Sequence, residues 1–256
     1  MNIQIIVATH KDYWMPADDL YLPVQVGSAG KPTLRDGWQR DDAGENISGK
    51  NPHYCELTGL YWAWKHLNAD YIGLVHYRRY FAGRCFGEKK RRIATRAQIE
   101  GKLQKADALL PRKRRYYIET NYGQYVHAHH EADLVTTKEI LRETCPEYLP
   151  CWETAMGRTY GHRFNMFVMK RDVFDAYCAW LFDVLFELEK RLDISGYSQN
   201  DARVFGFVSE RLLDIWLMKN EIAAVELPTV NLENQHWPKK IAAFLKRKAL
   251  GGRGRK

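Results

Sequence analysis

Residues 70–81, which read DYIGLVHYRRYF, decide the fold of this chain. Their apolar run, residues 71–75, stops abruptly at His76, Tyr77 and two arginines. A continuous apolar run of this length is typical of a strand buried on both faces of a parallel sheet, although a short buried helix has the same pattern. We interpret residues 71–75 as the central strand of an α/β domain.

Polar and positive side chains follow both this run and the first apolar run of the chain, residues 3–8. The residues at the two places are Thr9, His10, Lys11, His76, Arg78 and Arg79. Ligands of open α/β sheets bind beyond the carboxyl ends of the strands, so we expect these side chains to bind an anion. The alternative is that Arg78 and Arg79 form ordinary surface ion pairs, since arginines are common at surfaces.

The composition indicates a globular protein with its own core. The chain has 256 residues, of which 45% are hydrophobic and 13% aromatic, enough for one large α/β domain or two small ones. Its five cysteines have no zinc-ribbon spacing and suggest reduced thiols, with Cys55 and Cys178 in the core on helices. No signal peptide or 20-residue apolar span is evident, and we expect a cytoplasmic protein.

The formal charge of +8 is concentrated at one end of the chain. Residues 239–256 contain eight lysines and arginines and no acid, whereas residues 1–238 are electrically balanced. We therefore expect a catalytic domain over residues 1–238 and a basic tail over residues 239–256. A basic helix with a small apolar face suits an anionic membrane surface, on which the protein would be peripheral. The alternative is a disordered, solubilising tail.

Strand and helix patterns alternate along the rest of the chain. We expect residues 40–50 to form an exposed loop or lid, Asn51 to cap a helix with Pro52 at its first position, and Asp172 to cap a long amphipathic helix. Further strands are expected at 106–110, 164–169 and 223–227, with a late helix that includes residues 205–217. This alternation predicts a single α/β domain with a mostly parallel sheet.

Several enzyme classes lack their sequence signals. The chain has no Gly-rich phosphate loop of the Rossmann or Walker type and no GxSxG elbow. His127 and His130 are three residues apart and could share a helix face with Glu131 or Asp133, which suggests a metal site. The absence of the HExxH pattern weighs against it. A cationic rim with many aromatic residues and late carboxylates favours binding of a nucleoside diphosphate that carries a sugar.

Four strings resemble a bacterial family of glycosyltransferases. They are NPHYCELTGLYWAWKH (51–66), DYIGLVHYRRYF (70–81), FNMFVMKRDVFDAYCAWLF (164–182) and RVFGFVSERLLDIWL (203–217). The family, long catalogued as a domain of unknown function, belongs to capsule, exopolysaccharide and O-antigen gene clusters. The resemblance, over residues 3–226, implies a GT-A-like fold and sugar transfer from a UDP-sugar donor to a lipid-linked glycan, with galactofuranose as the best-described sugar.

The resemblance also exposes a departure from ordinary GT-A enzymes, which hold Mn or Mg with an Asp-x-Asp pair after the central strand. Here His76, Tyr77 and Arg78 occupy that place and cannot form the usual oxygen site of a hard cation. We expect no metal cofactor, with Lys11, Arg78 and Arg79 compensating the diphosphate directly. The alternative is that carboxylates distant in sequence, such as Asp107 or Asp201, hold a divalent cation (Mn or Mg).

An inverting transfer needs a carboxylate that removes the proton of the acceptor hydroxyl. In GT-A-like enzymes the late helical segment closes the site, so Glu210 is our first candidate and Asp201 the second, with Glu56 as a third. An ion pair with Arg211 is the alternative role of Glu210. The expected acceptor-binding residues are His162, Arg163 and Asn165.

Two other function classes compete with sugar transfer. A nucleic-acid-binding protein would explain the basic clusters, but the neutral body and the lack of an RRM, HTH or OB signature weigh against it, and we expect no nucleic-acid partner. A non-catalytic scaffold of a polysaccharide assembly complex is the stronger alternative, because sequence does not reveal turnover.

Overall fold

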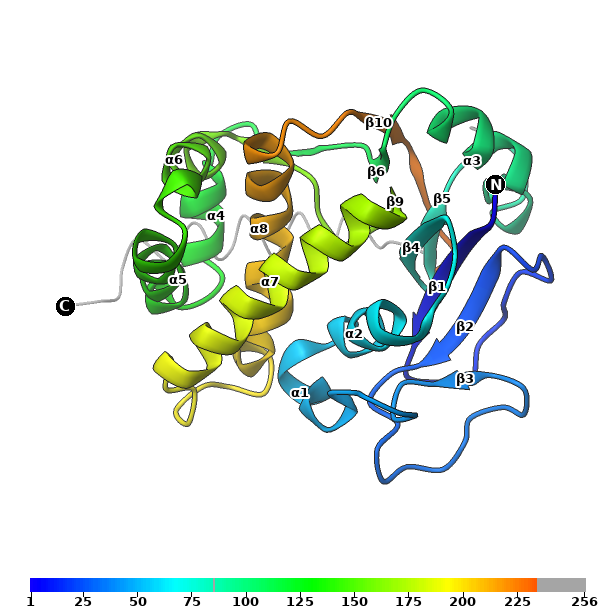
Figure 1. Cartoon of the computed structure of the whole chain (residues 1–256), viewed down its shortest axis with the longest axis horizontal. Helices are drawn as coiled ribbons and strands as arrows, with labels where there is room; N and C mark the ends of the chain where they lie inside the picture. The colour runs from blue at the N-terminus through cyan, green and yellow to red at the C-terminus, as the bar shows by residue number, and fades with distance from the viewer. Residues whose placement is uncertain (85, 234–256) are drawn as a thin grey trace.

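A computed structural model of the chain describes residues 1–84 and 86–233. It has a central sheet with helices on both sides (Figure 1). Helices α2 and α7 cover one face of the sheet, α3 lies on the other, and α4 to α6 gather at the end of the molecule beyond α8. The α/β prediction is confirmed. The tail at 239–256 lies outside the described residues, among which no helix is long and apolar enough to cross a membrane.

The main path of the sheet has the strand order β10-β6-β9-β4-β1-β2-β3. Neighbours pair in parallel at β1–β2, β1–β4, β2–β3 and β6–β10, whereas β9 runs antiparallel to both β4 and β6. The sheet is therefore mostly parallel, with an antiparallel strand at its centre. The strands of this path are β1 (Ile3–Thr9), β2 (Tyr21–Gln25), β3 (Gln39–Arg40), β4 (Tyr71–His76), β6 (Ala108–Pro111), β9 (Phe167–Lys170) and β10 (Ala224–Leu227).

Two short pairs extend this frame. β5 (Arg79–Phe81) turns back on β4 and pairs with β11 (Thr229–Asn231), while β7 (Arg114–Arg115) pairs with β8 (Tyr160–Gly161). The α-helices are α1 (Asn51–Tyr54), α2 (Leu57–His66), α3 (Arg96–Leu103), α4 (Asn121–Val126), α5 (Glu131–Thr144), α6 (Leu149–Gly157), α7 (Arg171–Arg191) and α8 (Val204–Lys219). Short 3₁₀ turns lie at Ser48–Lys50, Lys90–Arg92, Pro146–Tyr148 and Asp201–Arg203.

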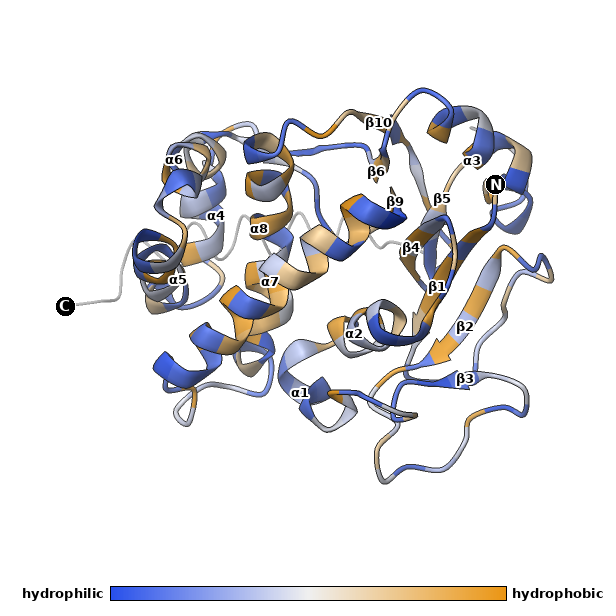
Figure 2. Ribbon diagram, viewed as in Figure 1, coloured by the Kyte–Doolittle hydropathy of each residue, from blue (hydrophilic) through white to orange (hydrophobic). Residues whose placement is uncertain are grey.

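The predicted central strand is β4, and its neighbour β1 is the predicted first strand. Both are apolar along most of their length (Figure 2), and Ile72, Leu74 and Val75 are fully buried. The register pairs Ala8 with His76, so the two strands end together at one edge of the sheet. This parallel pairing brings the two predicted groups of positive residues to one place.

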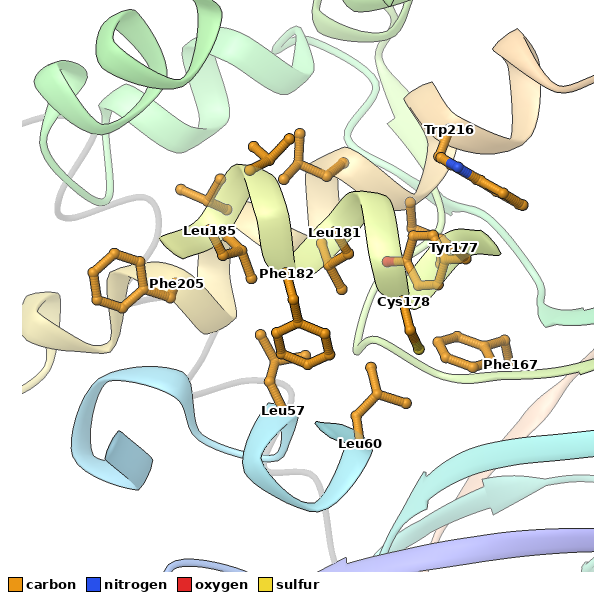
Figure 3. Packing of buried hydrophobic residues seen from close by; sticks show 14 of the residues in the cluster. Leu57, Leu60, Phe167, Tyr177, Cys178, Leu181, Phe182, Leu185, Phe205 and Trp216 are labelled. Atoms are coloured by element: carbon orange, nitrogen blue, oxygen red, sulfur yellow. The ribbon is translucent and has the colours of Figure 1, made fainter. Parts of the chain in front are cut away.

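The core between sheet and helices forms around α7 (Figure 3). Phe182 and Cys178 point from α7 toward Leu57 and Leu60 of α2, with Phe167 of β9 beside them. The outer side of α7 is hydrophilic (Figure 2), as its helical periodicity predicts. Cys178 is a buried thiol as expected; Cys55, by contrast, is half-buried and lies outside the helices.

Three local predictions need correction. The helix expected after Asn51 is capped by Lys50 and broken at Cys55, whose φ of 55° separates α1 from α2. Asp172 lies inside α7, whose N-cap is Lys170. The strand expected from residue 164 begins only at Phe167. There Phe164 and Asn165 have φ values of 80° and 52°, which a regular strand does not allow.

The segment expected to be an exposed loop or lid is fastened to the body. Asp41 is fully buried, and its carboxylate accepts hydrogen bonds from the backbone of Gly27 (2.7 Å) and Ser28 (3.0 Å) and from the Ser48 hydroxyl. Burying a carboxylate is costly unless its oxygens are satisfied, so these bonds fix the segment in place. Its tip, around Gly44, stays exposed.

Gly73 of β4 lies between β1 and β9, where the neighbouring strands approach it closely. A Cβ atom there would come within 2.8 Å of the Phe167 carbonyl oxygen and of the Val168 side chain. Gly73→Ala should therefore lower the free energy of unfolding by about 1–3 kcal/mol, the usual cost of overpacking. Gly101→Ala is the matched control, because open space surrounds Gly101 in α3 and alanine favours a helix. Urea unfolding checks both; equal stability of the two variants would contradict the packing.

Candidate functional site

The candidate site begins at the shared carboxyl edge of β1 and β4. Thr9, the last residue of β1, is buried, and its hydroxyl donates to the Lys11 carbonyl (2.6 Å) and accepts from the Lys11 amide (3.3 Å). Thr9 thus shapes the turn that presents His10 and Lys11. At the end of β4, His76 donates from Nε2 to the Phe164 carbonyl (2.6 Å), which ties the strand to the turn before β9.

Lys11 and Arg78 lie together at the surface of this edge. Both pair with Glu233, Arg78 Nη1 at 3.0 Å and Lys11 Nζ at 3.8 Å, and each side chain is about half exposed. The ion pair considered from the sequence is therefore present for Arg78. Exposed pairs contribute little stability, so a more highly charged ligand can displace Glu233.

Arg79 has a different environment from Arg78. Its guanidinium carbon lies 3.7 Å from the centre of the Phe164 ring, and it forms no ion pair with any residue that the structure describes. Burial lowers the pKa of Arg79 and the charge of Arg78 acts in the same direction, while Glu210 and Glu56 oppose them. Arg79 is thus a half-buried cation that faces two carboxylates without a direct contact to either.

Glu56 lies at the break between α1 and α2 and is held by Asn165. The Asn165 amide donates to Glu56 Oε1 (2.7 Å) and to the Gly206 carbonyl (3.1 Å), and its oxygen accepts from the Ser209 hydroxyl (3.0 Å). Asn165 is fully buried in the left-handed turn before β9. It therefore joins three elements, the α1–α2 break, the turn before β9 and α8, and it fixes the Glu56 carboxylate at their junction.

Glu210 projects from α8 close to the same cations. Its Oε2 accepts from Arg211 Nη1 (3.0 Å), as the alternative interpretation expected. The other terminal nitrogen of Arg211, Nη2, donates to Gln124 Oε1, and Arg211 is nearly fully buried. Glu210 Oε1 has no hydrogen-bond partner among residues 1–84 and 86–233, and the side chain is 19% exposed. The Arg211 pair therefore orients Glu210 and leaves one oxygen available.

Arg203 is a site residue that sequence reasoning missed. It is exposed just before α8, and its Nε donates to Cys55 Sγ (3.1 Å). Burial acts to lower the pKa of Arg203, but Cys55, Glu56 and Glu210 outweigh it and the pKa is raised. An arginine ahead of a helix resembles an ordinary surface residue. The one available signal was its place at the start of a string shared with the family.

His10 links these cations into one positive region. Partial burial lowers its pKa, and the charges of Lys11, Arg78, Arg203 and Lys31 act in the same direction. These cations come from four separate stretches of the chain. Their joint effect on one imidazole indicates that the carboxyl edge, the turn after β4 and the start of α8 share an electrostatic field.

Asp201 is engaged elsewhere. It accepts from the Ser198 hydroxyl (2.7 Å) and from His129 Nδ1 (3.3 Å), and His130 lies 3.8 Å away. The Ser198 hydrogen bond is the main cause of the lowered pKa of Asp201. These contacts favour a role in fixing the turn before α8. His127 pairs instead with Glu119, and the described part of the chain holds no cluster of three metal-ligating side chains.

His162 and Arg163 are buried and bonded inside the protein. His162 Nδ1 lies 2.5 Å from Asp214 and Nε2 lies 3.2 Å from Glu226. Arg163 donates to the Tyr116 hydroxyl (2.9 Å) and to Asn121. These contacts favour a supporting role for both residues under the β7–β8 pair. Their contact with an acceptor stays a prediction, as does that of Asn165, whose amide is occupied by Glu56.

The comparisons with known proteins concern the family and the fold of the chain. The family described as "Domain of unknown function (DUF4422)" matches residues 4–221. The chain belongs to the DUF4422 family. Among solved structures it is similar to the apo structure of the WbbM bifunctional glycosyltransferase, with a TM-score of 0.84 and 30% sequence identity. The match covers 91% of this chain and 46% of the WbbM chain. No curated protein matches.

The family resemblance is thereby confirmed, and so is the expected glycosyltransferase-type α/β fold. The chain spans just under half the length of the WbbM chain that it matches. WbbM is bifunctional by name, so the match concerns one part of that protein.

Binding of a diphosphate should raise the pKa of His10, because the anion compensates the four cations that now disfavour protonation. Proton NMR titration of the imidazoles, with and without inorganic pyrophosphate, measures the change. His127 is the internal control, since it pairs with Glu119 outside this region. An unchanged His10 titration with saturating pyrophosphate would place the anion elsewhere.

Proposed function

We propose that this protein is a glycosyltransferase that moves a sugar from a UDP-sugar donor to a growing cell-surface polysaccharide of the capsule, exopolysaccharide or O-antigen type. The observation that carries the proposal is the row of cations at the carboxyl edge of β1 and β4, which faces the carboxylates Glu56 and Glu210. Similarity to the WbbM bifunctional glycosyltransferase supports it. Galactofuranose, transferred with inversion, is the proposed sugar.

The positive edge would hold the diphosphate of the donor. In sugar transfer, UDP leaves with the electrons of the glycosidic bond, and its growing negative charge must be stabilised. Arg78 and Lys11 would exchange Glu233 for phosphate oxygens, and Arg79 would add a charge that burial makes more effective. Thr9 shapes the turn that presents His10 and Lys11, and His76 fixes the opposite wall.

The proposed chemistry ends with proton removal from the acceptor. As the acceptor oxygen attacks the anomeric carbon, its proton passes to a carboxylate. Glu210 keeps one oxygen without a partner among the described residues and is our first choice. Glu56, whose Oε1 accepts from Asn165, comes second because it lies outside the late helical segment that closes the site in GT-A-like enzymes. Asp201, originally ranked second, moves behind both because its oxygens serve Ser198 and His129.

We propose that transfer proceeds without a metal cofactor, because the position of the usual Asp-x-Asp pair carries His76, Tyr77 and Arg78. Mn or Mg dependence stays the alternative. The proposed acceptor is a lipid-linked glycan, reached by a protein that lies on the inner face of the cytoplasmic membrane. The basic tail, at 239–256, is the proposed membrane contact, and it lies outside the described residues.

A non-catalytic scaffold is the alternative to a transferase. In a scaffold, a half-buried arginine would be expected to pair directly with a carboxylate, whereas Glu56 and Glu210 act on Arg79 without a direct contact and leave its charge available for a ligand. Nucleic-acid binding is disfavoured because residues 1–238 are electrically balanced and carry no RRM, HTH or OB signature.

Glu210→Gln should bind UDP as the parent does. Its transfer rate should be about 10²–10⁴-fold lower, since the amide accepts no proton. Asp201→Asn is the matched control: another acidic residue of the late segment, it should keep most of the activity. Calorimetry with UDP and a radiolabelled sugar-transfer assay measure the two properties. Parental transfer by Glu210→Gln would move the role of base to Glu56.

Arg79→Gln should weaken UDP binding by about tenfold or more, the effect of losing one charge-assisted contact. Arg91→Gln removes the same charge from a side chain that is 83% exposed and should leave the affinity unchanged. Isothermal titration calorimetry compares the variants, with thermal unfolding as a check on folding. Equal affinities for UDP would show that Arg79 does not contact the diphosphate.

A further inference from the structure

The segment between β6 and α4 carries two adjacent apolar side chains into solvent. Tyr117 is 83% exposed and Ile118 is 69% exposed, although both residue types usually bury most of their surface. Four positive residues, Arg112 to Arg115, lie just before them, separated only by Tyr116, and are all exposed. We call residues 112–118 the basic loop. In Figure 1 its trace runs from β6 toward α4.

The base of the basic loop is rigid. Arg114 and Arg115 form β7, which pairs with Gly161 and Tyr160 of β8. The next residue, Tyr116, donates its amide to the Thr159 carbonyl (2.7 Å), and its hydroxyl accepts from the buried Arg163 (2.9 Å). The loop is thus anchored up to Tyr116, and only its tip projects.

The backbone at the tip keeps the two side chains outside. Tyr117 has a φ of 65°, a left-handed conformation that a bulky residue adopts at a cost. The Ile118 amide closes this sharp turn on the Tyr116 carbonyl (2.8 Å). Strain at an exposed aromatic residue does nothing for the core. It points instead to a contact made outside the molecule.

The charge around the tip is positive. Lys113 pairs with Glu226 at 3.2 Å, and no ion pair engages Arg112, Arg114 or Arg115 in the part of the chain that the structure describes. The nearest acid in sequence, Glu119, is only 12% exposed at its side chain and lies 3.2 Å from His127. The apolar tip is therefore flanked by cations that lack an acidic partner.

We propose that the basic loop docks the protein on an anionic lipid bilayer, with Tyr117 and Ile118 in the interface and the arginines on lipid phosphates. Tyrosine is favoured at membrane interfaces, because its ring is apolar and its hydroxyl stays in water. Each cation near an anionic surface adds attraction, and an apolar side chain adds more by leaving water. A single apolar tip matches the flat surface of a bilayer. The groove of a nucleic-acid-binding protein would instead need a row of aromatic residues.

Docking at this place would turn the candidate site toward the membrane. β6 and β4 both run antiparallel to β9, so they point the same way and their carboxyl ends share one edge of the sheet. Arg114, just beyond β6, also acts electrostatically on Arg79. A lipid-borne substrate would then reach the site along the bilayer surface. Docking itself is independent of the proposed function, because it is measured without turnover.

The test is co-sedimentation of the full chain with phosphatidylcholine vesicles, with and without phosphatidylglycerol. The parent should bind the anionic vesicles and lose binding at high salt. The double variant Tyr117→Ser/Ile118→Ser should bind them about tenfold more weakly, since it removes the inserted surface and no charge. Val135→Ser is the control, because Val135 is an exposed apolar residue of α5, 44% exposed. It should bind as the parent does.

Parental affinity of the double variant for anionic vesicles would overturn the proposal, because Tyr117 and Ile118 would then contribute nothing to membrane binding. The proposal would also be overturned if the parent protein did not bind vesicles but bound a soluble polyanion, such as heparin, through the basic loop. UDP affinity, measured in parallel, should be the same in the parent and the double variant. Loss of UDP binding would indicate that the substitutions disturb the fold of the site.

Discussion

The parallel pairing of β1 with β4 is the constraint on which the site depends. Two apolar runs bury each other at the centre of the sheet, and their register makes Ala8 face His76. Parallel strands end at the same edge, so polar residues that are distant in sequence must meet there. Antiparallel pairing would have carried the two groups to opposite edges and left no positive site.

The cost of gathering positive charge at that edge is offset in two ways. Glu233 neutralises the exposed pair of Lys11 and Arg78. The more buried Arg79 instead faces Glu56 and Glu210 across a longer distance, while Asn165 and Arg211 hold these two carboxylates. The edge stays folded without a ligand and keeps charge available for an anion. Under the proposed function, a site of this kind would be preorganised, because its cations are already gathered at one edge before the anion binds.

The sequence predicted the frame of the sheet better than the details of the site. A mainly apolar run needs only burial to form a central strand, so β1 and β4 lie where their patterns placed them. The break at Cys55 and the turn at Phe164 and Asn165 depend on left-handed backbone, and these residue types give little local sign of it. The break at Cys55 positions Glu56, and the turn at Phe164 and Asn165 positions Arg79. Because neither was predicted, the hydrogen bond by which Asn165 holds Glu56 was not predicted either.

Residues whose function depends on distant partners were also hard to rank. Glu210 ranked ahead of Asp201 from the sequence, and the contacts of Ser198 and His129 with Asp201 now place Asp201 behind Glu56 as well. Arg203 gave no local signal, because its site partners, Cys55 and Glu56, lie far away in sequence at the break between α1 and α2. His162 and Arg163 were expected to bind the acceptor, and their local sequence does not indicate which residues they contact. They form hydrogen bonds with Asp214, Glu226 and Asn121, all distant in sequence.

The central claim is that protein cations, acting without a metal, recognise a diphosphate at the edge of β1 and β4. Calorimetry of the full chain with UDP and with uridine, both in EDTA, tests it most directly. A cationic site predicts that UDP binds at least about tenfold more tightly than uridine, the gain expected from one or more charge-assisted contacts. Equal affinities in EDTA, with an advantage of UDP that appears only after Mn or Mg is added, would contradict it.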